Sequence, residues 1–111
     1  FDVTVTKNRP YPDPLSRRAI KSDDEGRFYV TPTSFSNTGE IRGFSRTVDD
    51  YDNTVQEATS YACALKSNAV NVRCYNPYLG PVPKGLYCCL ETYWGNSSVT
   101  NTLRVQGRYT P

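Results

Sequence analysis

The sequence contains no histidine and no methionine, and it has no long apolar run. Without histidine, the chain cannot form a Ser-His or Cys-His nucleophile pair, a histidine-ligated metal site or an imidazole acid–base group. No wholly apolar stretch is longer than five residues, the length of residues 61–65, which is far too short to cross a membrane. These absences exclude a large part of enzyme chemistry and any apolar membrane span.

Large aliphatic side chains are also scarce, because Leu, Ile, Val and Phe together make up only 22 of the 111 residues. This fraction lies near the limit below which chains stay disordered. Nine tyrosines, one tryptophan, a net charge of only +2 and four cysteines favour a folded domain instead. The length fits one small domain with one modest core.

The four cysteines are Cys63, Cys74, Cys88 and Cys89, and their spacing lacks the paired C-x-x-C pattern of zinc sites. We therefore expect two disulfides, which small secreted domains use to support a modest core. A Cys63–Cys74 bridge with a Cys88–Cys89 bridge is disfavoured, because the second would close a strained ring. The pairings 63–88 with 74–89 and 63–89 with 74–88 stay open.

The N-terminal region suggests export and processing. The chain begins at Phe1 and lacks methionine, so we expect that a signal peptide has been removed. Leu15-Ser16-Arg17-Arg18 resembles the Leu-x-x-Arg sites that kexin-type proteases cleave, although an exposed basic loop explains it equally well. Residues 1–18 are thus a candidate pro-segment or N-terminal arm, and residues 19–111 form a single disulfide-stapled domain. Asn96 begins an Asn-Ser-Ser glycosylation motif, which agrees with secretion.

Hydrophobic periodicity predicts an α+β fold that is mainly antiparallel β, as a sandwich or a sheet. Alternation over residues 27–48, interrupted by a turn at 36–39, predicts a hairpin. A capping-box pattern and one apolar stripe predict a helix at 54–67. Three later strands, near 69–75, 86–93 and 99–109, are expected to form an antiparallel meander that packs against this helix.

Neither the acidic nor the basic residues point to a catalytic or metal site. Acidic clusters at 23–25 and 49–52 have the composition of solvated loops, and no calcium-loop pattern is present. The basic residues are scattered, and a few isolated charges give only weak, salt-sensitive binding to nucleic acid. We therefore expect no enzyme activity, no cofactor, no metal and no nucleic-acid partner.

Aromatic residues are the clearest surplus. In the expected meander, Tyr75, Tyr87 and Tyr93 share one side, while Tyr78 and Trp94 lie in or beside adjacent loops. Such a patch would stack on sugar rings or anchor a protein interface. Alternatively, residues 27–48 cover this face, and the tyrosines form part of a two-layer core.

Small size, the motif at residues 15–18, an even cysteine count and the absence of a catalytic constellation resemble the secreted effectors and elicitors of plant-associated fungi. The resemblance is to this class and to no single family. It implies an extracellular, monomeric and non-enzymatic protein, with possible later entry into a host cell. Such a protein would bind a host molecule, most plausibly a protein, through exposed strand faces and the 76–85 loop. The alternatives are a cell-wall glycan-binding module using Tyr75, Tyr87, Tyr93 and Trp94, and a ribonuclease-like scaffold that binds RNA without catalysis.

Overall fold

The computed structural model describes residues 1–9, 17–49 and 54–111, and in these residues it has nine strands and no helix. Short polar turns separate stretches in which buried and exposed side chains alternate, which is the pattern of a half-buried strand. The strands are β1 (Asp2–Thr6), β2 (Ala19–Ile20), β3 (Arg27–Phe35), β4 (Glu40–Val48), β5 (Thr54–Thr59), β6 (Cys63–Lys66), β7 (Cys74–Pro77), β8 (Tyr87–Asn96) and β9 (Thr102–Thr110).

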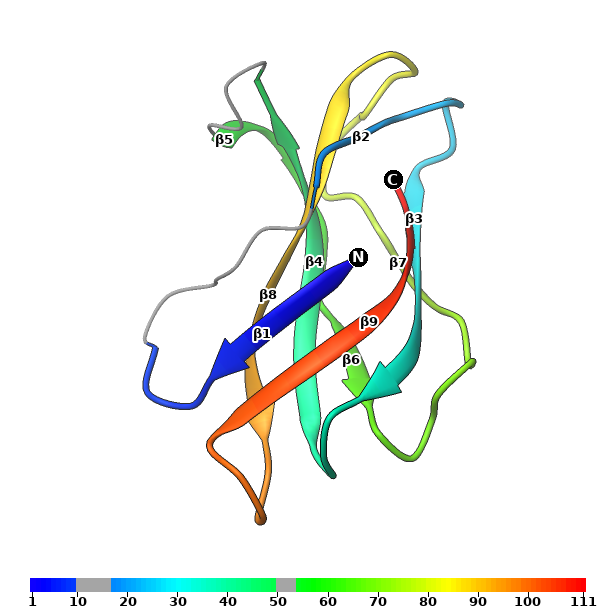
Figure 1. Ribbon diagram of the computed structural model, residues 1–111. Helices are drawn as coiled ribbons and strands as arrows, with labels where there is room; N and C mark the ends of the chain where they lie inside the picture. The colour runs from blue at the N-terminus through cyan, green and yellow to red at the C-terminus, as the bar shows by residue number, and fades with distance from the viewer. Residues whose placement is uncertain (10–16, 50–53) are drawn as a thin grey trace.

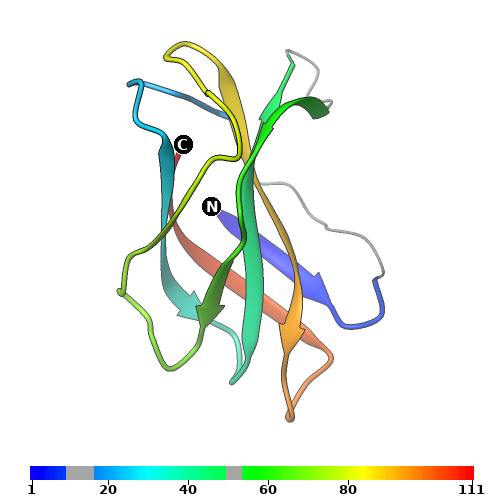
Figure 2. The same cartoon turned by 180° about the vertical axis from the view of Figure 1, so that it is seen from behind.

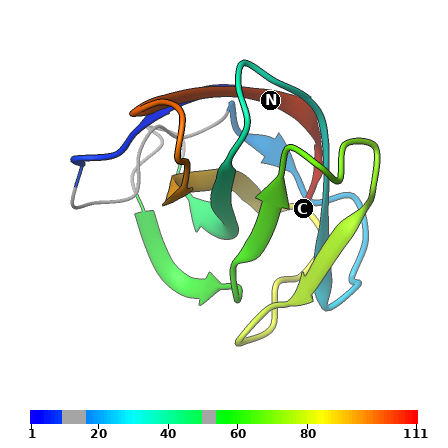
Figure 3. The ribbon, with the colours of Figure 1, turned by 90° about the horizontal axis from the view of Figure 1, so that it is seen from below.

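The strands form two antiparallel sheets that face each other across one core (Figure 1). Sheet A has the order β1-β9-β3-β7. Sheet B has the order β2-β8-β4, and both β5 and β6 pair with β4. Figure 2 shows β6 beside β4 from behind, and the view from below in Figure 3 places β1 and β9 on one side of the molecule. Thus β8 and β4 form the centre of one layer, and β9 and β3 form the centre of the other.

The core is built from the inward side chains of both sheets. On β9, Leu103 and Val105 are fully buried, whereas Arg104 and Gln106 between and after them are exposed. Val3 and Val5 of β1 lie opposite them in register and are each 2% exposed. Sheet B and the loops contribute Ile41, Leu65, Leu90, Tyr78 and Val82, and β3 contributes Phe28 and Val30.

The expected helix at 54–67 is wrong, because this segment forms β5 and β6 at the edge of sheet B. Cys63 and Leu65 are buried while Ala64 and Lys66 are exposed, which is a period of two. The four-residue strand is too short for this period to stand out against the apolar stripe in the sequence. Pairing with β4, from Gly43–Cys63 to Glu40–Lys66, therefore overrides the local helical preference.

The expected hairpin and meander are wrong in their partners. The turn after Phe35 joins β3 to β4, but these strands belong to different sheets and do not pair with each other. Likewise β7 pairs with β3, β8 pairs with β4 and β2, and β9 pairs with β3 and β1. The alternating faces of β8 and β9 follow the sequence pattern, but the pattern does not specify which strand lies beside which.

The disulfide prediction is wrong as well. The structure has one disulfide, between Cys63 of β6 and Cys74 of β7, with 6.2 Å between their Cα atoms. This is part of the pairing that the sequence disfavoured. Cys88 and Cys89 are buried thiols, and as neighbours on β8 they point to opposite faces of sheet B. The single bridge joins the two sheets along one side of the sandwich.

Candidate functional site

The outer face of sheet A gathers several arginine and tyrosine side chains that are exposed or half-buried. Cross-strand register places Tyr29 of β3 opposite Tyr75 of β7, and Thr31 opposite Arg108 of β9. Arg27 precedes Tyr29 on the same face by two residues, and Arg73 precedes Tyr75 by two. We call Arg27, Tyr29, Arg73, Tyr75 and Arg108 the arginine–tyrosine face.

Within this face, guanidinium groups and aromatic rings form a continuous stack. The Arg73 guanidinium lies 4.7 Å from the centre of the Tyr29 ring, and the Arg27 guanidinium lies 5.2 Å from the centre of the Tyr75 ring. The two rings are 5.9 Å apart and inclined by 47°. Each distance is within the range of cation–π and aromatic contacts. Together, these contacts link four long side chains of β3 and β7 and their flanks into one stack.

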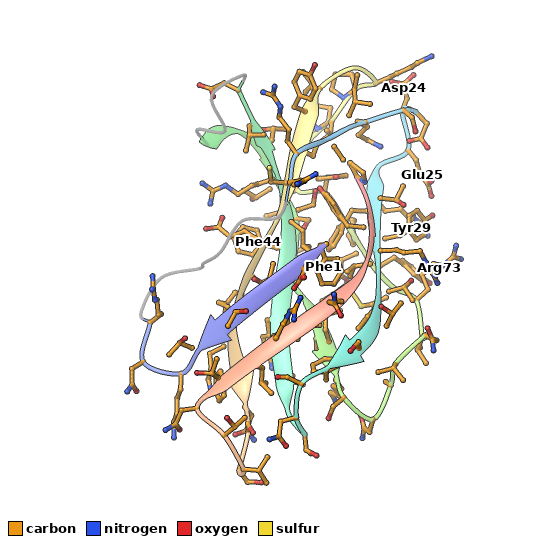
Figure 4. The ribbon with its side chains drawn as sticks, viewed as in Figure 1. Phe1, Asp24, Glu25, Tyr29, Phe44 and Arg73 are labelled. Carbon is orange, nitrogen blue, oxygen red and sulfur yellow. A yellow bond between two sulfur atoms is a disulfide. The ribbon has the colours of Figure 1, made fainter. Side chains whose placement is uncertain are left out.

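Glu25 contacts two members of the stack, Tyr29 and Arg27. The Tyr29 hydroxyl donates a hydrogen bond to the Glu25 carboxylate, and this bond raises the pKa of Tyr29 above its ordinary value. The same carboxylate lies 3.7 Å from Arg27 Nε. The negative charge of Glu25 is thus already shared between Tyr29 and Arg27. Figure 4 shows Glu25, Tyr29 and Arg73 together at this edge of the molecule.

Beside the stack lies an open hollow of about 510 Å³, lined by Arg73 and Arg108 together with Glu25, Tyr29, Thr31, Asn71 and Thr110. Asn71 adopts a left-handed backbone conformation, with φ of 62°, and its amide donates to the Pro32 carbonyl at 2.7 Å. This turn brings Arg73 to the rim. No ion pair joins Arg73 or Arg108 to a carboxylate of the described residues. Neither guanidinium is therefore paired with a described carboxylate, although Arg73 stacks on the Tyr29 ring and the Glu25 carboxylate lines the same hollow.

Exposed apolar side chains extend the face along the β7 side of the sandwich. Val72, directly before Arg73, is 58% exposed, and Tyr75, two residues after Arg73, is 52% exposed. Beyond β7, the exposed Leu79 is held next to β5 by a hydrogen bond from its amide to the Thr59 carbonyl. A surface that combines tyrosine, arginine and exposed aliphatic groups has the composition of protein interaction sites.

At the other edge of sheet A, Arg104 is already paired with a carboxylate. Its Nε and Nη2 atoms donate to the two carboxylate oxygens of Asp2 at 3.0 and 2.7 Å. The Arg104 hydrogen bond lowers the pKa of Asp2, and Asp2 raises that of Arg104. This two-pronged pair holds β1 against β9 and reduces the positive charge at this end of the face.

Buried hydroxyl groups form a second cluster, inside the core. Ser45 Oγ lies 2.7 Å from the Tyr78 hydroxyl and 2.6 Å from the Tyr109 hydroxyl, and its amide donates to Ser60 Oγ. Burial raises the pKa values of Tyr78, Tyr109 and the nearby Cys88 thiol. Groups that resist ionisation are poor nucleophiles and bases near neutral pH. We assign this cluster to stability, because it links β4, β9 and the loop after β7.

The aromatic residues singled out in the sequence do not form one site. Tyr75 is on the arginine–tyrosine face, whereas Tyr78 is buried. Tyr87 and Tyr93 lie on the outer face of sheet B, where Arg18 covers the Tyr87 ring at 4.5 Å and Phe44 lies 6.3 Å from Tyr93. Trp94 is partly buried against the core. The expectation that Tyr75, Tyr87 and Tyr93 share a side is therefore wrong, because β7 and β8 belong to different sheets.

Sequence reasoning did not identify Arg27, Tyr29, Arg73 or Arg108 as site residues. The available signal was the alternation itself, in which outward-facing residues such as Arg27 and Tyr29 flank an inward side chain, here the fully buried Phe28. The strand order β9-β3-β7, which brings three separate segments to one face, could not be inferred from the sequence pattern.

The remaining predicted sites are on the surface. Arg17 and Arg18 are exposed just before β2, while Leu15 and Ser16 of the same motif lie outside the described residues. Asn96 is exposed at the end of β8 and lines a small open hollow beside Thr38 and Lys66. The 76–85 loop is mixed, since Leu79 is exposed but Tyr78 and Val82 are buried.

Across residues 1–9, 17–49 and 54–111, no group of three or more acidic, cysteine or histidine side chains is arranged to hold a metal ion. The described residues also contain no helix that is long and apolar enough to cross a membrane. The scan against protein-family models found no match, and neither the curated proteins nor the solved structures included a chain similar to this one.

Proposed function

We propose that this protein is a secreted, non-enzymatic binding domain that recognises an acidic surface of a partner protein through the arginine–tyrosine face. The observation that carries the proposal is the stack Arg73–Tyr29–Tyr75–Arg27, in which two aromatic rings and two guanidiniums are ordered in advance. Tyrosine and arginine dominate the binding energy of protein interfaces, and a pre-ordered set loses less entropy on association. The disulfide between the sheets supports an oxidising compartment.

The glycan-binding alternative is not favoured by the geometry. It required Tyr75, Tyr87, Tyr93 and Trp94 to form one stacking platform. These side chains lie on the outer faces of two sheets and against the core. An acidic protein surface fits better, because Arg73 and Arg108 offer two forked donors beside exposed apolar groups.

The test is a quantitative pull-down from extracellular and cytosolic plant extracts with the immobilised protein. Plant extracts are chosen because of the resemblance to fungal effectors. Arg73→Ala/Arg108→Ala should weaken capture of a saturable partner by about tenfold or more, and added salt should weaken the wild-type interaction. Arg42→Ala/Lys66→Ala removes the same charge from exposed positions on sheet B and should have little effect.

Three outcomes would contradict the proposal. The first is the absence of any saturable protein partner. The second is an equal loss of binding in the sheet-A and sheet-B variants. The third is capture that disappears when the extract is treated with ribonuclease, which would favour an RNA ligand on the same arginines.

A further inference from the structure

The only two adjacent basic residues in the sequence, Arg17 and Arg18, lie on the connection between the two sheets. Before them, β1 belongs to sheet A; after them, β2 belongs to sheet B. Both arginines are exposed, and the Arg18 guanidinium lies over the Tyr87 ring at 4.5 Å and donates to the Asp49 carbonyl at 3.4 Å. We propose that Arg17-Arg18 is a processing site whose cleavage yields a two-chain protein, in which residues 1–18 stay bound as the edge strand of sheet A.

Residues before the site are held by contacts independent of the connection. All five residues of β1 pair with β9, from Asp2–Gln106 to Thr6–Thr102. The N-terminal amine donates to the Gly107 carbonyl at 2.6 Å, and the Gly107 amide donates back to the Phe1 carbonyl at 3.0 Å. Beyond β1, the Lys7 amide bonds to the Asn101 carbonyl.

Side chains of β1 add to this backbone pairing. Val3 and Val5 are each 2% exposed and belong to the core, and Phe1 packs against it. On the outer face, Asp2 makes its two-pronged pair with Arg104. Figure 4 shows Phe1 where β1 crosses in front of the core. Loss of residues 1–18 would expose the core side chains that pack against Val3 and Val5, together with the edge of β9. Burial of this surface therefore favours a cut protein that keeps residues 1–18 bound.

Residues after the site are also anchored locally. Ala19 and Ile20 pair with Cys88 and Tyr87 of β8. The Lys21 amide donates to the Leu86 carbonyl at 2.8 Å, and the Lys21 side chain is fully buried, with its ammonium 2.9 Å from Asp23 Oδ1. A break before Ala19 therefore leaves the first three residues of the new chain, Ala19 to Lys21, paired with β8 and the residue before it.

The chemistry is hydrolysis by a serine protease that is specific for paired basic residues. One water molecule is consumed, the bond between the Arg18 carbonyl carbon and the Ala19 nitrogen breaks, and the new ends are a carboxylate and an ammonium group. After the cut, retention of residues 1–18 becomes a bimolecular equilibrium and depends on protein concentration.

The experiment treats the full folded chain with a subtilisin-family protease specific for paired basic residues. We expect complete conversion to a species heavier by one water. It should separate into two fragments under denaturing conditions but elute as one folded species in native size exclusion. Arg18→Gln should abolish the cut. Cleavage only of the unfolded chain would overturn the proposal, as would loss of residues 1–18 from the cut protein under native conditions.

A matched pair of variants tests whether β1 is the anchor. In the cut protein, Val5→Ala should weaken retention of residues 1–18 about tenfold, because it removes buried methyl groups. Thr4→Ala, at an exposed position of the same strand, should leave retention unchanged. If Val5→Ala fails to fold, exchange of a labelled synthetic peptide of residues 1–18 into cut wild type gives the same information. Equal retention of residues 1–18 in the two variants would contradict a strand held by pairing with β9. A cut protein that neither exchanges the labelled peptide nor releases residues 1–18 in denaturant would contradict it as well.

Discussion

Ser45 is the residue on which the polar part of the core depends. Its hydroxyl lies within hydrogen-bond distance of the Tyr78 and Tyr109 hydroxyls, so its removal leaves two buried groups short of a partner. Ser45→Ala should lower the free energy of unfolding by about 1–3 kcal/mol. Urea denaturation followed by circular dichroism measures this loss. Ser22→Ala, at an exposed position, is the control, and equal midpoints for the two variants would contradict the role of the cluster.

The same tyrosines predict a loss of stability at alkaline pH. Burial raises the pKa values of Tyr78 and Tyr109 above the ordinary value of 10.0. Above pH 10 the unfolded chain loses these protons while the native state keeps them, so the free energy of unfolding falls as the pH rises. Denaturant titrations from about pH 8 to pH 11.5 should show the fall, with a shallower slope in Tyr78→Phe. Identical slopes in the variant and the wild type would argue against a buried, neutral Tyr78.

At the scale of elements, the close approach of β9 to β3 and to the Phe1 ring depends on Gly107. A Cβ atom at this position would overlap the Thr31 carbonyl oxygen and lie 2.7 Å from the Phe1 ring. Gly107→Ala should therefore shift backbone in two strands and lower the free energy of unfolding by about 1–3 kcal/mol. At Gly26 an added Cβ meets nothing within 4 Å, so Gly26→Ala is the matched control. Thermal melts of the two variants provide the comparison, and a harmless Gly107→Ala would contradict this close approach.

The disulfide between β6 and β7 is the other element-level support. It closes a short loop, with a sequence separation of 11, and the entropy of such a loop corresponds to about 3 kcal/mol. Cys63→Ser/Cys74→Ser should lose about this much stability in guanidinium titrations.

Thiol labelling under non-reducing conditions separates this pairing from the alternatives. Cys88 and Cys89 should react only after unfolding, because both are buried, whereas Cys63 and Cys74 should react only after reduction. If all four cysteines react in the unfolded chain without prior reduction, the result would contradict the Cys63–Cys74 disulfide.

The longer strands β3, β4, β8 and β9 were visible in the sequence, but their partners were not. The strand expected at 69–75 is wrong over most of its length, because β7 begins only at Cys74 and residues 69–71 form a turn. Alternation identified the inward faces of β8 and β9, from Cys88 to Thr92 and from Leu103 to Val105. It failed at residues 54–67, where the strands are short and their pairing with β4 decides the conformation. It also failed to separate the faces of β7 and β8, because strand order is set by contacts between distant segments. The arginine–tyrosine face depends on that order and was missed with it.

At the scale of the whole molecule, the topology predicts slow folding. Pairs such as Val3–Val105 and Ile41–Trp94 join segments that are far apart in the sequence, and sheet A unites strands from both ends of the chain. Domains with this kind of non-local pairing fold in about milliseconds to seconds. Stopped-flow refolding monitored by Trp94 fluorescence tests the expectation. A main phase completed within about ten microseconds would mean that local structure, and not sheet assembly, limits the rate.

The antiparallel register of β1 and β9 also places Phe1 beside Gly107, four residues before Pro111. At the rise of an extended chain, those residues span about 13 Å, which a linker of a few glycines can bridge. A circularly permuted chain that starts at Ala19 and ends at Arg18 would therefore keep the pairing of every strand. In this permuted chain, β1 would be synthesised after β9 instead of before it. It could therefore pair with β9 after the rest of sheet A has formed.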